Sequence, residues 1–234
     1  MQTKYYDMKF ITIFTSAMLL AAVTAPGQTF QFTNAVNQAV PDGNPTGVRS
    51  TIDVSGVTGQ TLNLDVSLNL SGGYNGDLYV SLTGPTGIYS VLLNRVGVSG
   101  SDSFGYGNTG LNITLSDHLG ASNIHWYQNA GYTLNGSGQL IGTWSADGLA
   151  LNLQASPSAA DGATPTAGLG SFDGSDANGT WTLFLADLAG GEQSTLVGWS
   201  LQVAAVPEPA SGSLLLLGAA AMAGVTWRRR ASRR

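Results

Sequence analysis

The chain of 234 residues contains no cysteine, and charged residues are only 10% of it. The absence of cysteine excludes a disulfide-stapled scaffold and thiolate-bound zinc or iron–sulfur centres. Histidine is also scarce: a Ser-His-Asp triad would have to use His118 or His125. The sequence lacks a Gly-x-Ser-x-Gly turn, a Walker A loop and a His-Glu-x-x-His pattern. We therefore predict a non-enzymatic protein.

Basic residues are nearly absent from the middle of the chain. Between residues 28 and 206 the cations are Arg49 and Arg95, and twelve aspartates and glutamates bring the net charge of this part to −10. A body this acidic repels a phosphate backbone, so we expect no binding to nucleic acid. The other basic residues lie near the two ends of the chain, where they are typical of topology signals.

The N-terminal segment has the layout of a secretory signal peptide. Lys4 and Lys9 precede an apolar run over residues 10–25, which ends in small residues. Cleavage after Gly27 would leave Ala25 at the third position before the cut. We predict that residues 1–27 are a signal peptide and that the chain is exported. An uncleaved anchor is the alternative, but the run is shorter than the roughly 20 residues of a typical span.

The C-terminal segment has three parts in a fixed order. An apolar stretch over residues 210–227 is just long enough to cross a bilayer as a single transmembrane helix, and the positive-inside rule keeps the following arginines in the cytoplasm. The flanking motifs are Val206-Pro207-Glu208-Pro209 and Arg228-Arg229-Arg230. This order resembles the PEP-CTERM sorting signal of Gram-negative exported proteins, which the membrane protease exosortase recognises and which often accompanies exopolysaccharide production.

The resemblance implies that residues 206–234 are a sorting signal. The chain would first be anchored in the inner membrane with a cytoplasmic C-terminus, and its body would then reach the cell envelope, the outer surface or the extracellular matrix. A plain C-terminal tail anchor is the alternative.

Between these signals the hydrophobic pattern has a period of two. Leu62, Leu64, Val66, Leu68 and Leu70 alternate with polar residues, as a strand with one buried and one wet face requires. The alternation recurs over residues 78–82, 181–185 and 199–203, and Gly-rich turns separate the segments. We predict an all-β domain over residues 28–205, an antiparallel β-sandwich or jelly roll.

The order of turns and strands in this body resembles a known module. The motifs are Asn75-Gly76-Asp77-Leu78, Leu82-Thr83-Gly84-Pro85-Thr86-Gly87, Asn178-Gly179-Thr180-Trp181-Thr182-Leu183 and Trp199-Ser200-Leu201. Together they resemble the P domain (P/Homo B) that follows the catalytic domain of subtilisin-like proprotein convertases, over residues 38–204. Gly72 stands where the family tends to have histidine, and the segment over residues 120–165 is longer than the corresponding segment of the family pattern. The resemblance implies an association with proteolysis, although the chain has no room for the catalytic domain.

Calcium is the ligand that we keep open. The resemblance implies that this kind of jelly roll can hold the ion, which binds several hard oxygens from carboxylates and loop carbonyls. The candidate ligands are Asp77, Asp173, Asp176, Asp187 and Glu192. The alternative is turn chemistry, because aspartate side chains bond their own backbone in turns.

A sugar platform is a second candidate site. The long segment over residues 120–165 contains a cluster of aromatic residues: Trp126, Tyr127, Tyr132 and Trp144. Exposed aromatic faces can stack on sugar rings. The alternative is that these four rings pack the long loop onto the sandwich.

Two hypotheses of function follow from the sequence. The first is an exported, non-enzymatic β-sandwich that is processed by an exosortase and contributes to adhesion or exopolysaccharide and biofilm association. The second is an accessory module for a subtilisin-like serine endopeptidase supplied by another chain.

Overall fold

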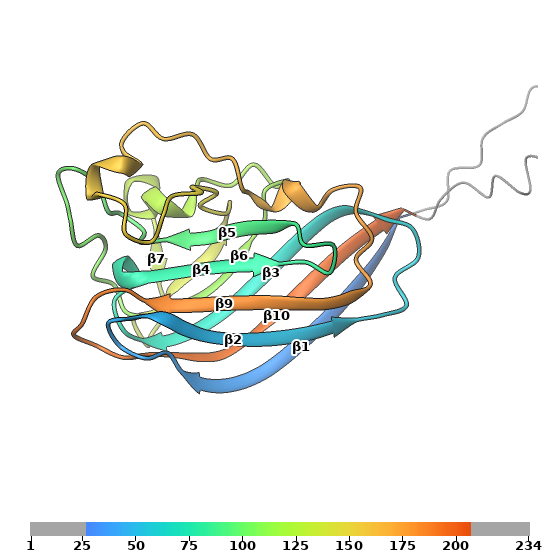
Figure 1. Cartoon of the computed structure of the whole chain (residues 1–234), viewed down its shortest axis with the longest axis horizontal. Helices are drawn as coiled ribbons and strands as arrows, with labels where there is room; N and C mark the ends of the chain where they lie inside the picture. The colour runs from blue at the N-terminus through green and yellow to red at the C-terminus, as the bar shows by residue number, and fades with distance from the viewer. Residues whose placement is uncertain (1–26, 207–234) are drawn as a thin grey trace, which may run out of the picture.

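The alternating segments form two β-sheets packed face to face in a computed structural model, which describes residues 27–206 (Figure 1). The six-stranded sheet has the order β1-β10-β3-β6-β8-β7, with β1 Gln28–Ala39, β10 Ser194–Val206, β3 Gln60–Gly72, β6 Leu111–Leu115, β8 Leu140–Trp144 and β7 Thr133–Leu134. The four-stranded sheet has the order β2-β9-β4-β5, with β2 Asn44–Val54, β9 Gly179–Asp187, β4 Leu78–Thr83 and β5 Tyr89–Asn94. Four short 3-10 helices lie in the connections: η1 Asn75–Asp77, η2 Ile124–Ala130, η3 Pro157–Ala160 and η4 Leu169–Phe172. This arrangement confirms the predicted β-sandwich.

One strand pair departs from the antiparallel pairing that we expected. β6 and β8 are parallel, with Leu111 opposite Leu140 and Leu115 opposite Trp144. A parallel pair needs a crossover connection rather than a tight turn. Residues 116–139, which include η2 and β7, supply that connection.

The period-two pattern of β3 places four of its five predicted core residues inside. Leu64, Val66, Leu68 and Leu70 are buried between the sheets. The prediction for Leu62 was wrong, because this side chain is 51% exposed. The pairing of β3 with β10 shifts register at this point, between Ala204 and Ala205, and Thr61 takes the buried position instead. A β-bulge of this kind leaves one residue out of the alternation.

Two tryptophans on central strands anchor the core. Trp181 on β9 and Trp199 on β10 are both buried, as their place in the alternation predicts. The Trp181 ring packs against Phe172 of η4, with 4.8 Å between ring centroids, and its indole N–H donates to the Ala177 carbonyl at 2.8 Å. The buried polar atom is therefore paired, as burial requires.

The long region between β6 and β9 covers the free edge of β5. The Val91 amide donates to the Ala167 carbonyl at 2.8 Å, and the Gly148 amide donates to the Val91 carbonyl at 2.9 Å. The Asp147 amide likewise donates to the Leu92 carbonyl. A loop therefore satisfies a sheet edge that would otherwise be open to strand addition.

The first and last strands of the sandwich are hydrogen-bonded neighbours. β1 and β10 lie side by side (Figure 1). Gln28 lies opposite Ala205, and Val206 lies opposite Gln60 of β3. Both flanking segments of the chain therefore leave from the same end of the six-stranded sheet. The predicted signal peptide, transmembrane helix and arginine cluster lie outside the described residues. Within residues 27–206, no helix is long and apolar enough to cross a membrane.

Candidate functional site

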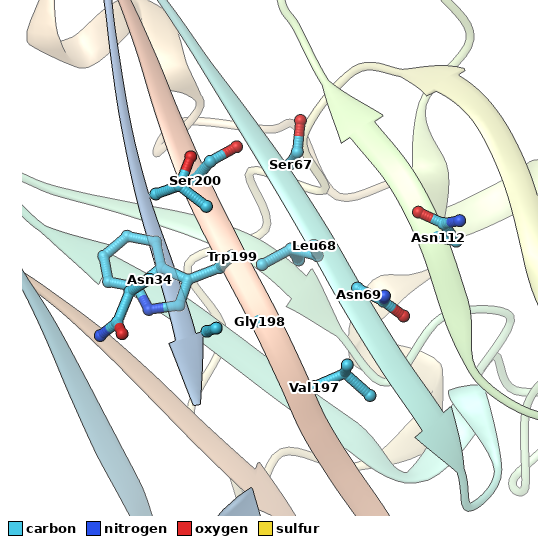
Figure 2. A pocket seen from close by; sticks show the side chains of 11 residues that line it. Asn34, Ser67, Leu68, Asn69, Asn112, Val197, Gly198, Trp199 and Ser200 are labelled. Atoms are coloured by element: carbon cyan, nitrogen blue, oxygen red, sulfur yellow. The ribbon is translucent and has the colours of Figure 1, made fainter. Parts of the chain in front are cut away.

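A groove of about 300 Å³ lies along the six-stranded sheet, between β1, β10, β3 and β6 (Figure 2). Its lining residues are Thr33, Asn34, Ala35, Ser67, Leu68, Asn69, Asn112, Val197, Gly198, Trp199 and Ser200. Ser67, Asn69, Asn112 and Ser200 alternate with the core-facing residues of their strands, so they belong to the outward face of the sheet.

Register shifts in β1 and β10 accompany the groove. β10 has an irregularity between Leu196 and Gly198, and β1 has one between Ala35 and Gln38. Gly198 lies where β10 closely approaches β1, since a Cβ there would be 2.9 Å from the carbonyl oxygen of Asn34. The missing side chain therefore allows the backbones of β10 and β1 to lie this close together beside the groove.

The lining is polar but uncharged. Register places Thr33, Ser200 and Ser67 side by side across three strands, and the Ser67 and Thr114 hydroxyls lie 3.1 Å apart. Asn69 lies opposite Asn112 and accepts a hydrogen bond from the Gln139 amide. None of the lining residues is acidic or basic, although the body as a whole is strongly acidic. The groove can therefore donate and accept hydrogen bonds through uncharged groups, and it presents no charge to an ionic ligand.

The structure does not gather the four predicted sugar-platform residues into one exposed surface. Tyr127 and Trp144 are buried, Trp126 is half-buried and Tyr132 is exposed. Tyr127 lies at the centre of an aromatic cluster, with ring centroids 4.6 Å from Tyr106, 5.5 Å from Tyr132 and 6.0 Å from Trp144. Burial raises the pKa of Tyr127 to about 12. This geometry corresponds to the packing alternative, in which the rings hold the long loop on the sandwich.

His125, which the sequence did not single out as a site residue, forms a buried pair with Asp147. Its Nδ1 lies 2.8 Å from Asp147 Oδ2, and its Nε2 lies 3.1 Å from the Val98 carbonyl oxygen. Burial disfavours the charged ring, but the bond to Asp147, the charge of that carboxylate and the Val98 carbonyl outweigh burial and raise the pKa of His125. Asp147 also accepts the Asn94 amide at 3.0 Å. The pair joins the long loop to β5.

His118 lies beside a serine and an aspartate without forming a triad. Its Nδ1 is 3.3 Å from Ser116 Oγ and 3.5 Å from Asp65 Oδ1. A Ser-His-Asp triad needs the serine and the aspartate on opposite ring nitrogens. The shared nitrogen here cannot carry a proton from one to the other.

The five predicted calcium ligands fall into separate places. Asp77 and Asp187 meet at one end of the four-stranded sheet, where burial and the charges of Asp77 and Asp42 raise the pKa of Asp187 to about 6. The Leu188 amide donates to the Asp77 carbonyl at 2.8 Å, so the two residues are held next to each other.

The other three candidates do not join this pair. Asp173 lines a different hollow together with Asp117 and His118. Asp176 is exposed and accepts the Asn178 backbone amide at 2.9 Å, a turn bond that lowers its pKa, and Glu192 is also exposed. Within residues 27–206, no group of three or more His, Asp or Glu side chains is arranged to hold a metal ion.

The C-terminal segment matches a family model described as the PEP-CTERM protein-sorting motif, over residues 205–230. This match confirms the predicted sorting signal. Proteins with this motif are exported and sorted to the cell surface, and the motif implies processing by an exosortase.

Part of the chain is similar to a known enzyme. It is 45% identical over 75 residues, or 32% of the chain, to leupeptin-inactivating enzyme 1 of Streptomyces exfoliatus. The chain spans 17% of the length of that protein.

Two solved structures are also similar. One is the serine protease of Aeromonas sobria in complex with a chaperone, with 17% identity, a TM-score of 0.45 and coverage of 78% of this chain and 28% of that one. The other is the serine protease of Aeromonas sobria without the chaperone, with 17% identity, a TM-score of 0.43 and coverage of 77% and 27%.

Proposed function

We propose that the chain is an exported, non-enzymatic β-sandwich module of the cell envelope or extracellular matrix, and that it contributes to adhesion or exopolysaccharide association. The observation that carries this proposal is the PEP-CTERM motif over residues 205–230. The last strand of the sandwich, β10, leads into this motif at Val206. The sandwich is therefore the part of the chain that the sorting route delivers.

The groove on the six-stranded sheet supports contact with a neutral polysaccharide. Sugars present hydroxyl groups that donate and accept hydrogen bonds, and the groove offers serine hydroxyls and asparagine amides on three neighbouring strands. Its volume of about 300 Å³ is at the lower end of typical ligand sites. An anionic polymer would meet no cation in the groove and a body with a net charge of −10, so an uncharged polymer fits better.

The absence of enzymatic activity is part of the same proposal. It is supported by the geometry at His118, where Ser116 and Asp65 approach the same ring nitrogen. The other histidine, His125, is only 1% exposed, and acceptors face both of its nitrogens. Both ring nitrogens of His125 are therefore engaged within the fold, and neither is free to activate a nucleophile.

Co-sedimentation of residues 28–206 with the source cell's own extracellular polysaccharide tests this function. We expect saturable binding that is lost in Asn112→Trp, which places a large ring in the groove. Gln31→Trp is the matched control, because Gln31 is also exposed on the six-stranded sheet but does not line the groove. Equal binding by the two variants would show that the polysaccharide binds outside the groove. No binding by the wild-type protein would refute the polysaccharide role.

A second candidate function is an accessory role for a subtilisin-like serine endopeptidase encoded elsewhere. The observation that favours it is the 45% identity to leupeptin-inactivating enzyme 1, which covers a small part of that enzyme. Affinity purification of the tagged full chain from the source cell tests this role. Recovery of one stoichiometric endopeptidase would support it, whereas its absence in cells that secrete such a protease would refute it.

A further inference from the structure

One edge of the six-stranded sheet is open. β1 lies at the border of this sheet, next to β10, and no strand in the part of the chain that the structure describes pairs with its other side (Figure 1). The pairing with β10 is regular from Gln28 to Ala35, before the register shift that ends at Gln38. Along this regular segment, alternate residues point their backbone N–H and C=O groups away from the sheet, where another strand could pair with them.

The other sheet edges carry features that hinder the addition of a strand. A loop covers the edge of β5, and β7 at the far border of the six-stranded sheet has only two residues. β2 carries Pro45, Arg49 and Asp53, all exposed. Covering loops, short strands, prolines and charged side chains are among the means by which native proteins protect sheet edges. Residues 28–35 of β1 have none of these features.

Both faces of this edge carry uncharged side chains. Thr29, Gln31 and Thr33 are exposed on the outward face of the sheet. Phe30 and Phe32 lie on the inward face, where they pack against the core but remain partly exposed. A strand added here would remove more of both rings from water. The edge therefore offers apolar surface as well as unpaired backbone groups.

We propose that β1 pairs antiparallel with β1 of a second copy of the chain, around a two-fold axis at Gln31. Such an axis, perpendicular to the sheet, makes one strand complementary to itself. It places Phe30 of each copy opposite Phe32 of the other, and Thr29 opposite Thr33. Aromatic pairs and threonine pairs across neighbouring strands stabilise a sheet.

Charge favours a second copy as the partner. The body carries a net charge of −10, whereas β1 carries none. Two acidic copies repel each other least along an uncharged strand, and a basic partner would instead be drawn to the acidic residues elsewhere on the body. Copies that carry the sorting motif also reach the same cell surface, which raises their local concentration.

This pairing would join the six-stranded sheets of two copies into one continuous sheet. Because the axis is perpendicular to the sheet, the grooves of both copies would lie on the same side. The pairing is measured without polysaccharide, and neither Thr29 nor Gln31 lines the groove. Failure of either proposal therefore leaves the other standing.

Sedimentation velocity of residues 28–206, which contain the whole described core, tests the association. We expect the mass to rise with concentration toward that of a dimer. Thr29→Lys combined with Gln31→Lys should weaken the association by about tenfold or more, because like charges then face each other across the axis. The corresponding double variant with glutamate should be equally weak, and a mixture of the lysine and glutamate variants should restore the dimer, which also shows that both are folded. Thr133→Lys combined with Gln154→Lys is the matched control, because it adds the same charge at exposed positions away from β1.

Cysteine variants test the position of the axis. The natural chain has no cysteine, so a single introduced cysteine can form a disulfide only between copies. Gln31→Cys should form a linked dimer under mild oxidation, since opposite Cα atoms in an antiparallel pair lie about 4.5–5.5 Å apart, within the range of a disulfide. Gln202→Cys is the matched control, because Gln202 is exposed opposite Gln31 but lies one strand farther from the axis.

Two results would overturn the proposal. One is a wild-type protein that stays monomeric at its highest soluble concentration, which would leave the edge of β1 to a different partner. The other is equal formation of disulfides by the Gln31→Cys and Gln202→Cys variants, which would show that the copies do not meet along β1.

Discussion

At the scale of single residues, the pair of His125 and Asp147 determines how the long loop is attached. Both ring nitrogens of His125 face acceptors, a carboxylate oxygen at 2.8 Å and a carbonyl oxygen at 3.1 Å. A neutral ring has one N–H, so only the imidazolium can donate to both partners. Although burial disfavours the charged ring, these two acceptors favour its protonation and raise the pKa of His125, and Asp147 balances the charge of the imidazolium.

This arrangement predicts that the stability depends on pH. The pKa of His125 is raised in the folded state above the roughly 6.5 of an unfolded chain. The ion pair therefore contributes its full stabilisation below about pH 6.5, and this contribution is lost as the pH rises through the folded-state pKa. We expect the free energy of unfolding, measured with urea, to fall as the pH is raised through this window.

Two variants identify the source of this pH dependence. His125→Asn should flatten the profile and destabilise the protein by about 2–4 kcal/mol at pH 6, because it leaves the Asp147 carboxylate buried without its partner. His118→Asn changes an exposed histidine and should keep the wild-type profile. If the profile of His125→Asn falls as steeply as that of the wild type, another group is responsible.

At the scale of strands, the alternation of residues predicted the core, and long-range pairing decided the exceptions. Trp181, Trp199 and the buried leucines of β3 follow the period of two. The bulge that exposes Leu62 depends on the register between β3 and β10, which are far apart in the sequence. No local pattern encodes that register, since it is set by how both strands pack.

The candidate sites show the same limit of prediction from sequence. The five acidic candidates were chosen by residue type, and the fold brings together only Asp77 and Asp187. The groove could not be predicted, because its residues come from four strands and its opening from bulges. The pairing of His125 with Asp147 likewise depends on the path of the segment that contains β7 and β8, which brings together residues 22 positions apart.

Two leucines of β3 give a matched test of the burial pattern and register of this strand. Leu70→Ala removes a fully buried side chain of β3 and should cost about 2–5 kcal/mol of the free energy of unfolding, because it leaves a cavity in the core. Leu62→Ala shortens a side chain that is 51% exposed and should change the stability by about 0.5 kcal/mol or less. Urea denaturation measures both. Equal losses would mean that Leu62 lies in the core after all and that the register of β3 is different.

At the scale of the whole molecule, the two ends of the sandwich are neighbours in one sheet. Gln28 pairs with Ala205, so the backbones of the first and last strands lie about 5 Å apart there. The segment predicted to lead export and the segment that carries the sorting motif therefore attach at one end of the body. The groove and the buried aspartate pair belong to the body between them, which has its own core from Val40 to Ala205.

Because the core lies within residues 40–205 and the two ends of the body are neighbours, we expect the body to tolerate a change in the order of its strands along the chain. We predict that a circular permutant, in which a short Gly-Ser linker joins Val206 to Gln28 and the chain opens between Gly120 and Ala121, keeps the native fold. Gly120 lies in an exposed turn with open space around it, so the new ends disrupt no packing there. Its Tm should lie within a few degrees of that of residues 28–206.

A control permutant, opened between Leu183 and Phe184, cuts β9, which pairs with both β2 and β4. This change should abolish cooperative unfolding. If the first permutant fails to fold while residues 28–206 in their native order do fold, the native order of the strands along the chain is required.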